Sequence, residues 1–269
     1  MANVLKTEVS RLDRPEILAF LFHPRSEIHS PLSRATRGED ILIPVSKDAV
    51  IGARFHLTGK HSPNILFFHG NGEIVADYDD LADIYTRLGI NFYPVDYRGY
   101  GRSTGRPTIT AMLRDCREIF NYWTHWLAQK NYDGPRIVMG RSLGSSSALE
   151  LVATHGDVID GIIIESGFAY SDTLLGIMGF SLELFGLTEE DGFRNIDKIR
   201  AFEKPTLIIH AELDHILPFK EGLTLYEVSP SFDKMFLKIP GANHNDIFLK
   251  GIRDYMDAVR GLAEKAANA

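Results

Sequence analysis

Ser142 stands between two glycines in the segment "RIVMGRSLGSS", which runs from Arg136 to Ser146. Apolar residues precede this serine and small residues follow it, which predicts a buried strand, a sharp corner and a helix. Glycines at such a corner allow the backbone to turn and the helix and strand to pack closely. A serine hydroxyl there is exposed above the sheet, as in a nucleophile elbow. The sequence therefore predicts Ser142 as a nucleophile.

A glycine-rich strand-to-helix turn, with or without a phosphate-binding role, is the other interpretation of this corner. Phosphate-binding loops follow the patterns G-x-x-x-x-G-K-[ST] or G-x-G-x-x-G. Neither pattern occurs in this sequence, so the corner favours a nucleophile over a phosphate site.

A serine hydroxyl is a weak nucleophile, so it needs a base to take its proton and an acid to orient that base. Asp214 follows a predicted strand in "HAELDHILPF", and His244 follows the last predicted strand in "IPGANHND". The carboxyl ends of parallel strands meet at one edge of a sheet, where ligands bind. We therefore predict a catalytic triad of Ser142, Asp214 and His244, in the chain order serine, acid, histidine.

Two nearby residues compete for these roles. Glu212 precedes Asp214 and lies nearer the strand, so it is the rival acid. His215 is the rival histidine, but it adjoins the acid in sequence and is poorly placed to bridge Asp214 and Ser142. The structural alternatives are a helix cap or turn position for Asp214 and a helix-start position for His244.

Acyl transfer also places negative charge on the former carbonyl oxygen, which backbone N–H groups stabilise in an oxyanion hole. One donor is predicted at Leu143, the residue after the nucleophile. The other is predicted at Asn71, in the loop "HGNGE" after the strand "ILFF". Gly70 and Gly72 let this loop approach closely. We expect His69 to hold the loop in place rather than to act as a base.

Alternating strands and helices must hold these residues. Continuous apolar runs predict strands that are buried on both faces, and apolar residues at helical spacing predict helices between them. The strands are predicted at residues 41–45, 49–57, 64–70, 91–97, 136–140, 161–166, 205–214 and 234–241. The helices are predicted at residues 73–89, 108–128, 143–155 and 245–265. The pattern indicates an α/β fold with a mostly parallel, doubly wound sheet and helices on both faces.

The predicted organisation is a single domain over residues 1–269. Residues 1–40 are polar and contain three prolines, so we expect an irregular segment over the surface. Residues 167–204 are longer than a crossover helix requires and contain the apolar stretch "LLGIMGFSLELFGL". This stretch predicts an inserted lid over the carboxyl ends of the strands, and its apolar residues either line an acyl pocket or form the lid's own core.

Composition excludes several classes of protein. The formal net charge of −7 lacks the basic footprint of nucleic-acid binding, so we expect no nucleic-acid partner. The one cysteine, Cys116, excludes an internal disulfide and fits a reducing compartment. The apolar run of residues 17–22 is too short for a membrane span. No Cys and His cluster has metal-ligand spacing, so we predict no metal and no cofactor, and we expect a cytoplasmic protein.

The sequence carries five motifs in one order: "HGNG", "DYRGYGRSTG", "GRSLG", "LDHILP" and "GANHND". Together they resemble the α/β-hydrolase superfamily over about residues 40–262. They are most similar to its small-lid serine hydrolases of the abhydrolase-domain type, the branch described as serine aminopeptidase or lysophospholipase-like. The resemblance implies the same nucleophile, acid, base and oxyanion donors at Ser142, Asp214, His244, Asn71 and Leu143. It also implies that the "DYRGYGRS" loop supports the elbow and the oxyanion loop.

We therefore expect a serine hydrolase that cleaves small-molecule carboxylic esters or thioesters through an acyl-enzyme intermediate. A peptidase or amidase with the same triad is the first alternative, in which Glu73 binds a substrate amine. The structural interpretation of Glu73 is an acidic residue in the first turn of a helix. A non-catalytic binding protein on the same fold is the second alternative. The sequence leaves the acyl chain length, the leaving group and the oligomeric state open.

Overall fold

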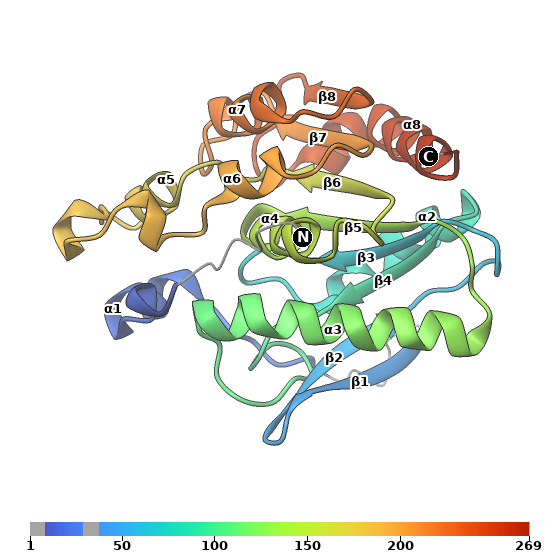
Figure 1. Ribbon diagram of the computed structural model, residues 1–269, viewed down its shortest axis with the longest axis horizontal. Coiled ribbons are helices and arrows are strands. Elements are labelled where there is room, and N and C mark those ends of the chain that lie inside the picture. The colour runs from blue at the N-terminus through green and yellow to red at the C-terminus, as the bar shows by residue number, and fades with distance from the viewer. Residues whose placement is uncertain (1–8, 29–37, 269) are drawn as a thin grey trace.

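An eight-stranded sheet forms the centre of the molecule (Figure 1). The computed structural model describes residues 9–28 and 38–268. The strands are β1 (Glu39–Ser46), β2 (Ala49–Phe55), β3 (Asn64–Phe68), β4 (Asn91–Val95), β5 (Arg136–Arg141), β6 (Gly161–Glu165), β7 (Thr206–Ala211) and β8 (Lys234–Ile239). They follow the order β1-β2-β4-β3-β5-β6-β7-β8, in which β3 to β8 are parallel and β1 and β2 are antiparallel to their neighbours. The predicted mostly parallel α/β sheet is confirmed.

Helices cover both faces of this sheet. α3 (Ile109–Lys130) and α4 (Ser145–His155) pack on one face, the front face in Figure 1, and α7 (Phe219–Val228) contributes to the same core. α2 (Asp79–Arg87) and α8 (Ile247–Ala266) pack on the other face, and η2 (Val75–Tyr78) leads into α2. The short η3 (Ser142–Gly144) connects β5 to α4.

Successive side chains of the central strands point to opposite faces. In β5, Val138 joins the core under α3 and α4, whereas Ile137 and Met139 join the core under α2 and α8. Both faces are apolar because helices cover a parallel sheet on both sides. By the same alternation Arg141, at the end of β5, faces the side of α2 and α8.

Two segments lie side by side near the carboxyl ends of the strands (Figure 1). The N-terminal strap, residues 9–28, contains η1 (Ser10–Leu12) and α1 (Pro15–Leu21). The lid segment, residues 167–204, contains α5 (Ser171–Gly176), η4 (Glu183–Phe185), η5 (Glu189–Asp191) and α6 (Asn195–Arg200). Arg11 Nη1 of the strap lies 2.6 Å from Asp191 Oδ1 of the lid segment. The rings of Phe20 and Phe180 meet edge to face, with centroids 5.8 Å apart.

The prediction of an irregular segment over residues 1–40 is wrong at α1. This helix begins with Pro15 at its first position, where the missing N–H costs no hydrogen bond. Ile17 and Leu21 are buried, so tertiary packing stabilises a helix too short to form alone. Residues 1–8 and 29–37, also part of that prediction, lie outside the described residues.

α7 is a helix that the sequence analysis did not predict. Gly222 lies inside it and lowers its helix propensity. A Cβ at this position would lie 2.3 Å from His210 Nδ1 on β7, so the helix needs a glycine to approach the sheet. The glycine that allows α7 to pack closely on the sheet therefore also weakens the helix pattern in the sequence.

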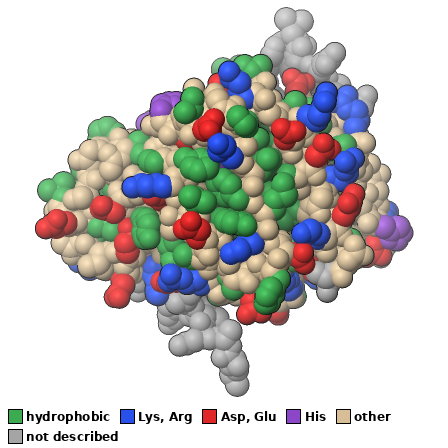
Figure 2. All heavy atoms as spheres, turned by 90° about the horizontal axis from the view of Figure 1, so that it is seen from above, with side chains coloured by type: hydrophobic (Ala, Val, Ile, Leu, Met, Phe, Trp, Pro, Cys, Tyr) green, Lys and Arg blue, Asp and Glu red, His purple; other side chains and the backbone are tan. Residues whose placement is uncertain are grey.

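β8 forms one edge of the sheet and is partly open to solvent. Figure 2 shows hydrophobic side chains gathered at the centre of the face that carries α7, β8 and α8. Met235, Leu237 and Leu262 line a groove of about 360 Å³ there, and Met235 is 44% exposed.

Among the described helices, none has the length and hydropathy that a membrane span requires.

His56 couples the stability of this fold to pH. It is 3% exposed, and burial together with the neighbouring Arg54 charge lowers its pKa to about 4. An unfolded histidine has a pKa of about 6.5, so between these values the unfolded chain binds more protons. His56 therefore lowers stability as pH falls from about 6.5 towards 4, by up to about 1.4 kcal/mol per pH unit.

We predict that His56→Asn flattens this dependence of the free energy of unfolding on pH. Urea unfolding at several pH values between 4.5 and 7 measures it. His61→Asn is the matched control, because the His61 side chain is 86% exposed. Equal slopes in wild type and His56→Asn would refute the prediction.

Candidate active site

Ser142 occupies a strained corner between β5 and α4. Its φ is +52°, a left-handed value that non-glycine residues rarely adopt. A Cβ at Gly140 would lie 2.3 Å from the Gly144 carbonyl oxygen. A Cβ at Gly144 would lie 2.2 Å from the Phe68 carbonyl oxygen at the end of β3. Both glycines are thus required for the turn, which leaves Ser142 partly exposed.

The structure brings the three predicted triad residues together. His244 Nε2 lies 3.0 Å from Ser142 Oγ, and His244 Nδ1 lies 2.8 Å from Asp214 Oδ2. Because the Asp214 carboxylate accepts a hydrogen bond from Nδ1–H, Nε2 keeps its lone pair towards the serine hydroxyl. This is the geometry in which a histidine removes a proton from a serine.

Local hydrogen bonds hold Asp214 as a carboxylate. Its Oδ1 accepts from the backbone N–H groups of Ile216 and Leu217, at 3.0 and 2.8 Å. Burial acts to raise the pKa of Asp214, but the hydrogen bond from His244 and the N–H of Leu217 outweigh it and lower the pKa. Burial also lowers the pKa of nearby His210, whose Nε2 donates to the Leu217 carbonyl at 2.9 Å. His244 therefore makes the closest imidazole contact with the Asp214 carboxylate.

The two rival residues lie elsewhere. Glu212 accepts hydrogen bonds from Lys238 Nζ at 2.6 Å and from the Gly241 N–H at 2.9 Å. It therefore ties the turn after β8 to the end of β7. His215 is exposed to solvent. The carboxylate that contacts His244 is that of Asp214, two positions beyond Glu212.

The loop predicted to supply an oxyanion donor, residues 69–73 and called the oxyanion loop below, is held by polar contacts. Asn71 Oδ1 accepts from Tyr100 Oη at 2.7 Å and from the His23 N–H of the strap at 2.9 Å. His69 is fully buried, and its Nε2 lies 3.2 Å from Asp96 Oδ1. The loop touches the elbow, because a Cβ at Gly144 would meet the His69 carbonyl oxygen at 2.7 Å.

Leu143 is buried in η3, directly after Ser142. The first N–H groups of a helix have no partner within it, so the Leu143 N–H is available at the elbow. The backbone N–H groups of Leu143 and Asn71 thus belong to two segments in contact. Their role as an oxyanion hole remains a prediction.

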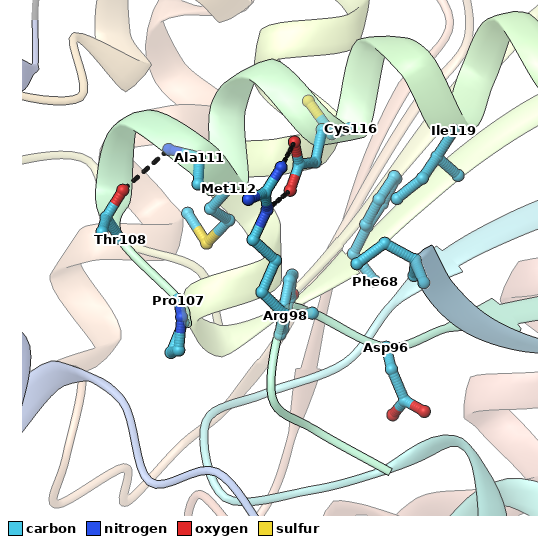
Figure 3. A pocket seen from close by; sticks show the side chains of 12 residues that line it. Phe68, Asp96, Arg98, Pro107, Thr108, Ala111, Met112, Cys116 and Ile119 are labelled. Atoms are coloured by element: carbon cyan, nitrogen blue, oxygen red, sulfur yellow. Dashed lines mark hydrogen bonds and ion pairs between the residues drawn. The ribbon is translucent and has the colours of Figure 1, made fainter. Parts of the chain in front are cut away.

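The loop after β4 contacts both the oxyanion loop and α3. Tyr97 Oη donates to the His69 carbonyl at 2.7 Å, and Arg98 is paired with Asp115 on α3 at 2.5 Å. Figure 3 shows Asp96 and Arg98 beside a closed cavity of about 10 Å³, which Cys116 and Met112 also line. Burial raises the pKa of the Cys116 thiol, so this cysteine is an inert packing residue.

Sequence reasoning missed Arg141 and did not predict its contacts with His244 and Glu73. Arg141 is 6% exposed, and its Nη2 donates to the His244 carbonyl at 3.0 Å. Its Nε lies 3.1 Å from Glu73 Oε1 and 3.5 Å from Glu165 Oε1. The signal in the sequence that could have found it is a charged residue at the end of an otherwise apolar, buried strand.

Within residues 9–28 and 38–268, no group of three or more His, Cys, Asp or Glu residues could hold a metal ion.

Comparison with known proteins finds proteins of similar sequence and solved structures of similar fold. A family model described as serine aminopeptidase, S33, matches residues 59–188. Human alpha/beta hydrolase domain-containing protein 17B is 33% identical over 211 residues, which cover 71% of this chain and 64% of that protein. The chain has the α/β-hydrolase fold and is similar in sequence to members of that superfamily. The resemblance inferred from the five sequence motifs is confirmed.

Solved structures of α/β hydrolases share the fold of this chain. An esterase from Pyrococcus furiosus has a TM-score of 0.71 and 15% identity, covering 90% of this chain and 98% of that chain. A soluble variant of monoglyceride lipase from Saccharomyces cerevisiae has a TM-score of 0.68 and 17% identity, covering 90% of this chain and all of that chain. The matches to the first curated relatives span 63% and 64% of their length.

We predict that Gly140→Ala destabilises this protein by about 1–3 kcal/mol, because the added methyl group overlaps the Gly144 carbonyl oxygen. Gly261→Ala is the matched control in α8, where a Cβ meets nothing within 4 Å. There the same substitution should stabilise the helix by about 0.5–1 kcal/mol. Urea unfolding measures both, and a neutral Gly140→Ala would contradict the close-packed corner.

Proposed function

We propose that this protein is a serine hydrolase that cleaves carboxylic ester or thioester bonds through an acyl-enzyme intermediate. The observation that carries the proposal is the hydrogen-bonded chain from Ser142 through His244 to the buried Asp214 carboxylate. The strained φ of Ser142 supports it, because such backbone strain is stored where a side chain must be presented for chemistry.

The mechanism follows from these contacts. His244 Nε2 removes the Ser142 hydroxyl proton while Oγ attacks the substrate carbonyl carbon. The N–H groups of Leu143 and Asn71 are the proposed donors to the oxyanion that forms. His244 then gives its proton to the leaving alcohol or thiol, and the acyl group stays on Ser142. Water repeats the sequence and releases the acid, while Asp214 stabilises the imidazolium in both halves.

The state of Glu73 favours an ester over a peptide substrate. An aminopeptidase needs a free acidic group for the substrate amino terminus, and Glu73 was the candidate. Its Oε2 accepts from the Gly70 N–H and from Tyr78 Oη, both at 2.6 Å, and its Oε1 pairs with Arg141. Both oxygens are therefore occupied by the protein, which supports ester or thioester hydrolysis over the peptidase alternative.

The lid segment supports a hydrophobic acyl group. Its apolar residues fall into two sets, one buried and one exposed. Leu174 and Leu175 are buried in the core, while Ile177 and Leu184 are 46% and 66% exposed. Phe180 packs against Phe20 of the strap. We therefore propose that medium-length acyl chains enter between strap and lid.

The first test is modification by a fluorophosphonate probe, with the labelled peptide mapped by mass spectrometry. We predict an adduct on Ser142 in wild type and none on Ser142→Ala, whose turnover of a p-nitrophenyl ester should fall about 10⁶-fold. A folded wild-type protein that forms no adduct would favour a binding protein on a hydrolase fold.

Asp214→Ala should lower kcat by about 10⁴-fold, because the imidazole loses the carboxylate that fixes its tautomer. Glu212→Ala and His215→Ala are the matched controls from the same loop, and we expect each to retain most activity. Steady-state hydrolysis of a p-nitrophenyl ester measures all three. A greater loss in Glu212→Ala than in Asp214→Ala would assign the acid to Glu212.

We further predict that acyl esters and thioesters of graded chain length are hydrolysed at least about 100-fold faster than aminoacyl p-nitroanilides, compared as kcat/KM. The physical reason is the engaged Glu73 carboxylate, which leaves the substrate amine without a partner. Faster cleavage of the anilides would favour the peptidase alternative.

A further inference from the structure

A buried charge cluster lies behind the nucleophile. Arg141, the residue before Ser142, ends β5 with its side chain 8% exposed. Glu165 ends β6 directly opposite it in the parallel register, with its side chain 1% exposed. Both side chains continue the alternation of Met139 and Ile163 and therefore face α2 and α8. There Glu165 Oε2 accepts a hydrogen bond from Tyr255 on α8 at 2.7 Å.

The Arg141 guanidinium connects three segments that the mechanism uses. It belongs to the elbow itself. Its Nη2 donates to the His244 carbonyl at 3.0 Å, and its Nε lies 3.1 Å from Glu73 Oε1. The other oxygen of Glu73 accepts from the Gly70 N–H at 2.6 Å, in the oxyanion loop. One buried cation thus links the nucleophile, the loop of the base and the oxyanion loop.

Stability alone is a poor explanation for this cluster. Buried ion pairs lose hydration that their attraction often fails to repay, and an apolar cluster of equal volume is frequently as stable. Arg141 Nη1 and Glu165 Oε1 are buried without a hydrogen-bond partner among the described residues. Burial acts to lower the pKa of Arg141, but the Glu165 and Glu73 charges outweigh it and raise the pKa, so the guanidinium stays charged. What the charges add is directed contact with specific backbone groups.

We propose that Arg141 is a positioning residue, which with Glu73 holds His244 and the oxyanion loop in place around Ser142. This inference rests on the proposed serine hydrolase function. Arg141 acts through the backbone of His244 and Gly70, so its loss slows the chemical step more than it weakens substrate binding. A displacement of about 1 Å in such groups lowers rates by up to about 10²-fold.

The test compares Arg141→Lys, Glu73→Gln and the double variant with wild type. Lysine keeps the positive charge but cannot make the directed contacts of the guanidinium fork. Glutamine keeps an oxygen for Gly70 but places an amide where Arg141 needs a carboxylate. The readouts are kcat and KM for p-nitrophenyl butyrate and the rate of fluorophosphonate modification of Ser142.

We expect each single variant to lower kcat and the modification rate by about 10–100-fold, with KM changed less than about 3-fold. The double variant should resemble the worse single variant, because both substitutions break the same connection. Arg54→Lys is the matched control. The Arg54 side chain is 5% exposed on β2 and pairs with Glu27, Asp40 and Asp79, so it tests loss of a buried guanidinium whose ion pairs involve neither His244 nor Glu73.

Amide hydrogen exchange provides a readout independent of turnover. We expect faster exchange in residues 69–73 and 240–246 of Arg141→Lys and Glu73→Gln, and unchanged exchange there in Arg54→Lys. Wild-type kcat and exchange in Arg141→Lys would overturn the inference, as would an equal loss of kcat in Arg54→Lys. If Arg141→Lys does not fold, Glu73→Gln decides by the same criteria, since its side chain is 25% exposed.

Failure of the inference and failure of the proposed function give different results. Wild type that labels at Ser142, together with variants that keep its kcat, overturns the role of Arg141 and leaves the hydrolase intact. Wild type that neither labels nor hydrolyses the ester overturns the function. In that case, exchange in the two loops still shows whether Arg141 holds them.

Discussion

Ser142 sits in a left-handed backbone conformation at the end of a buried strand, and the surrounding molecule is arranged to sustain it. Such a conformation costs of order 1–3 kcal/mol and persists only where neighbouring structure prevents relaxation. Gly140 and Gly144 permit a turn so tight that α4 begins against the carbonyl groups at the end of β3. That contact sets the distance between Ser142 and the loop after β3, and so between the proposed attacking oxygen and the expected oxyanion donors.

The parallel sheet solves a second problem, the assembly of groups that are distant in sequence. Ser142, Asp214 and His244 follow β5, β7 and β8, whose carboxyl ends reach the same edge. Burial and hydrogen bonding then decide which histidine is hydrogen-bonded to Asp214. Burial disfavours the charged form of His210, and the Leu217 carbonyl occupies its Nε2. Both imidazoles lie near Asp214 Oδ2, His244 Nδ1 at 2.8 Å and His210 Nε2 at 3.6 Å, but only His244 is hydrogen-bonded to it.

The oxyanion loop is anchored from two sides by polar contacts. On one side His23 of the strap and Tyr100 hold the Asn71 side chain. On the other side Glu73, paired with buried Arg141, holds the Gly70 N–H. Hydrogen bonds constrain direction as well as distance, whereas apolar packing would fix only volume. The strap also contacts the lid segment, so one N-terminal element borders both the oxyanion loop and the expected entry for substrate.

The sequence by itself determined the sheet, its main helices and the position of the elbow. Those features depend on local patterns: apolar alternation, helical spacing and two glycines around Ser142. It also narrowed the catalytic acid to Asp214 or Glu212. These residues are two positions apart in the same loop, so a local pattern does not tell which of the two side chains points at His244. The tertiary structure decided which carboxylate contacts His244, because that depends on how the loops after β7 and β8 meet. Likewise α1, α7 and the Arg141 cluster are stabilised by contacts between distant segments, which no local pattern specifies.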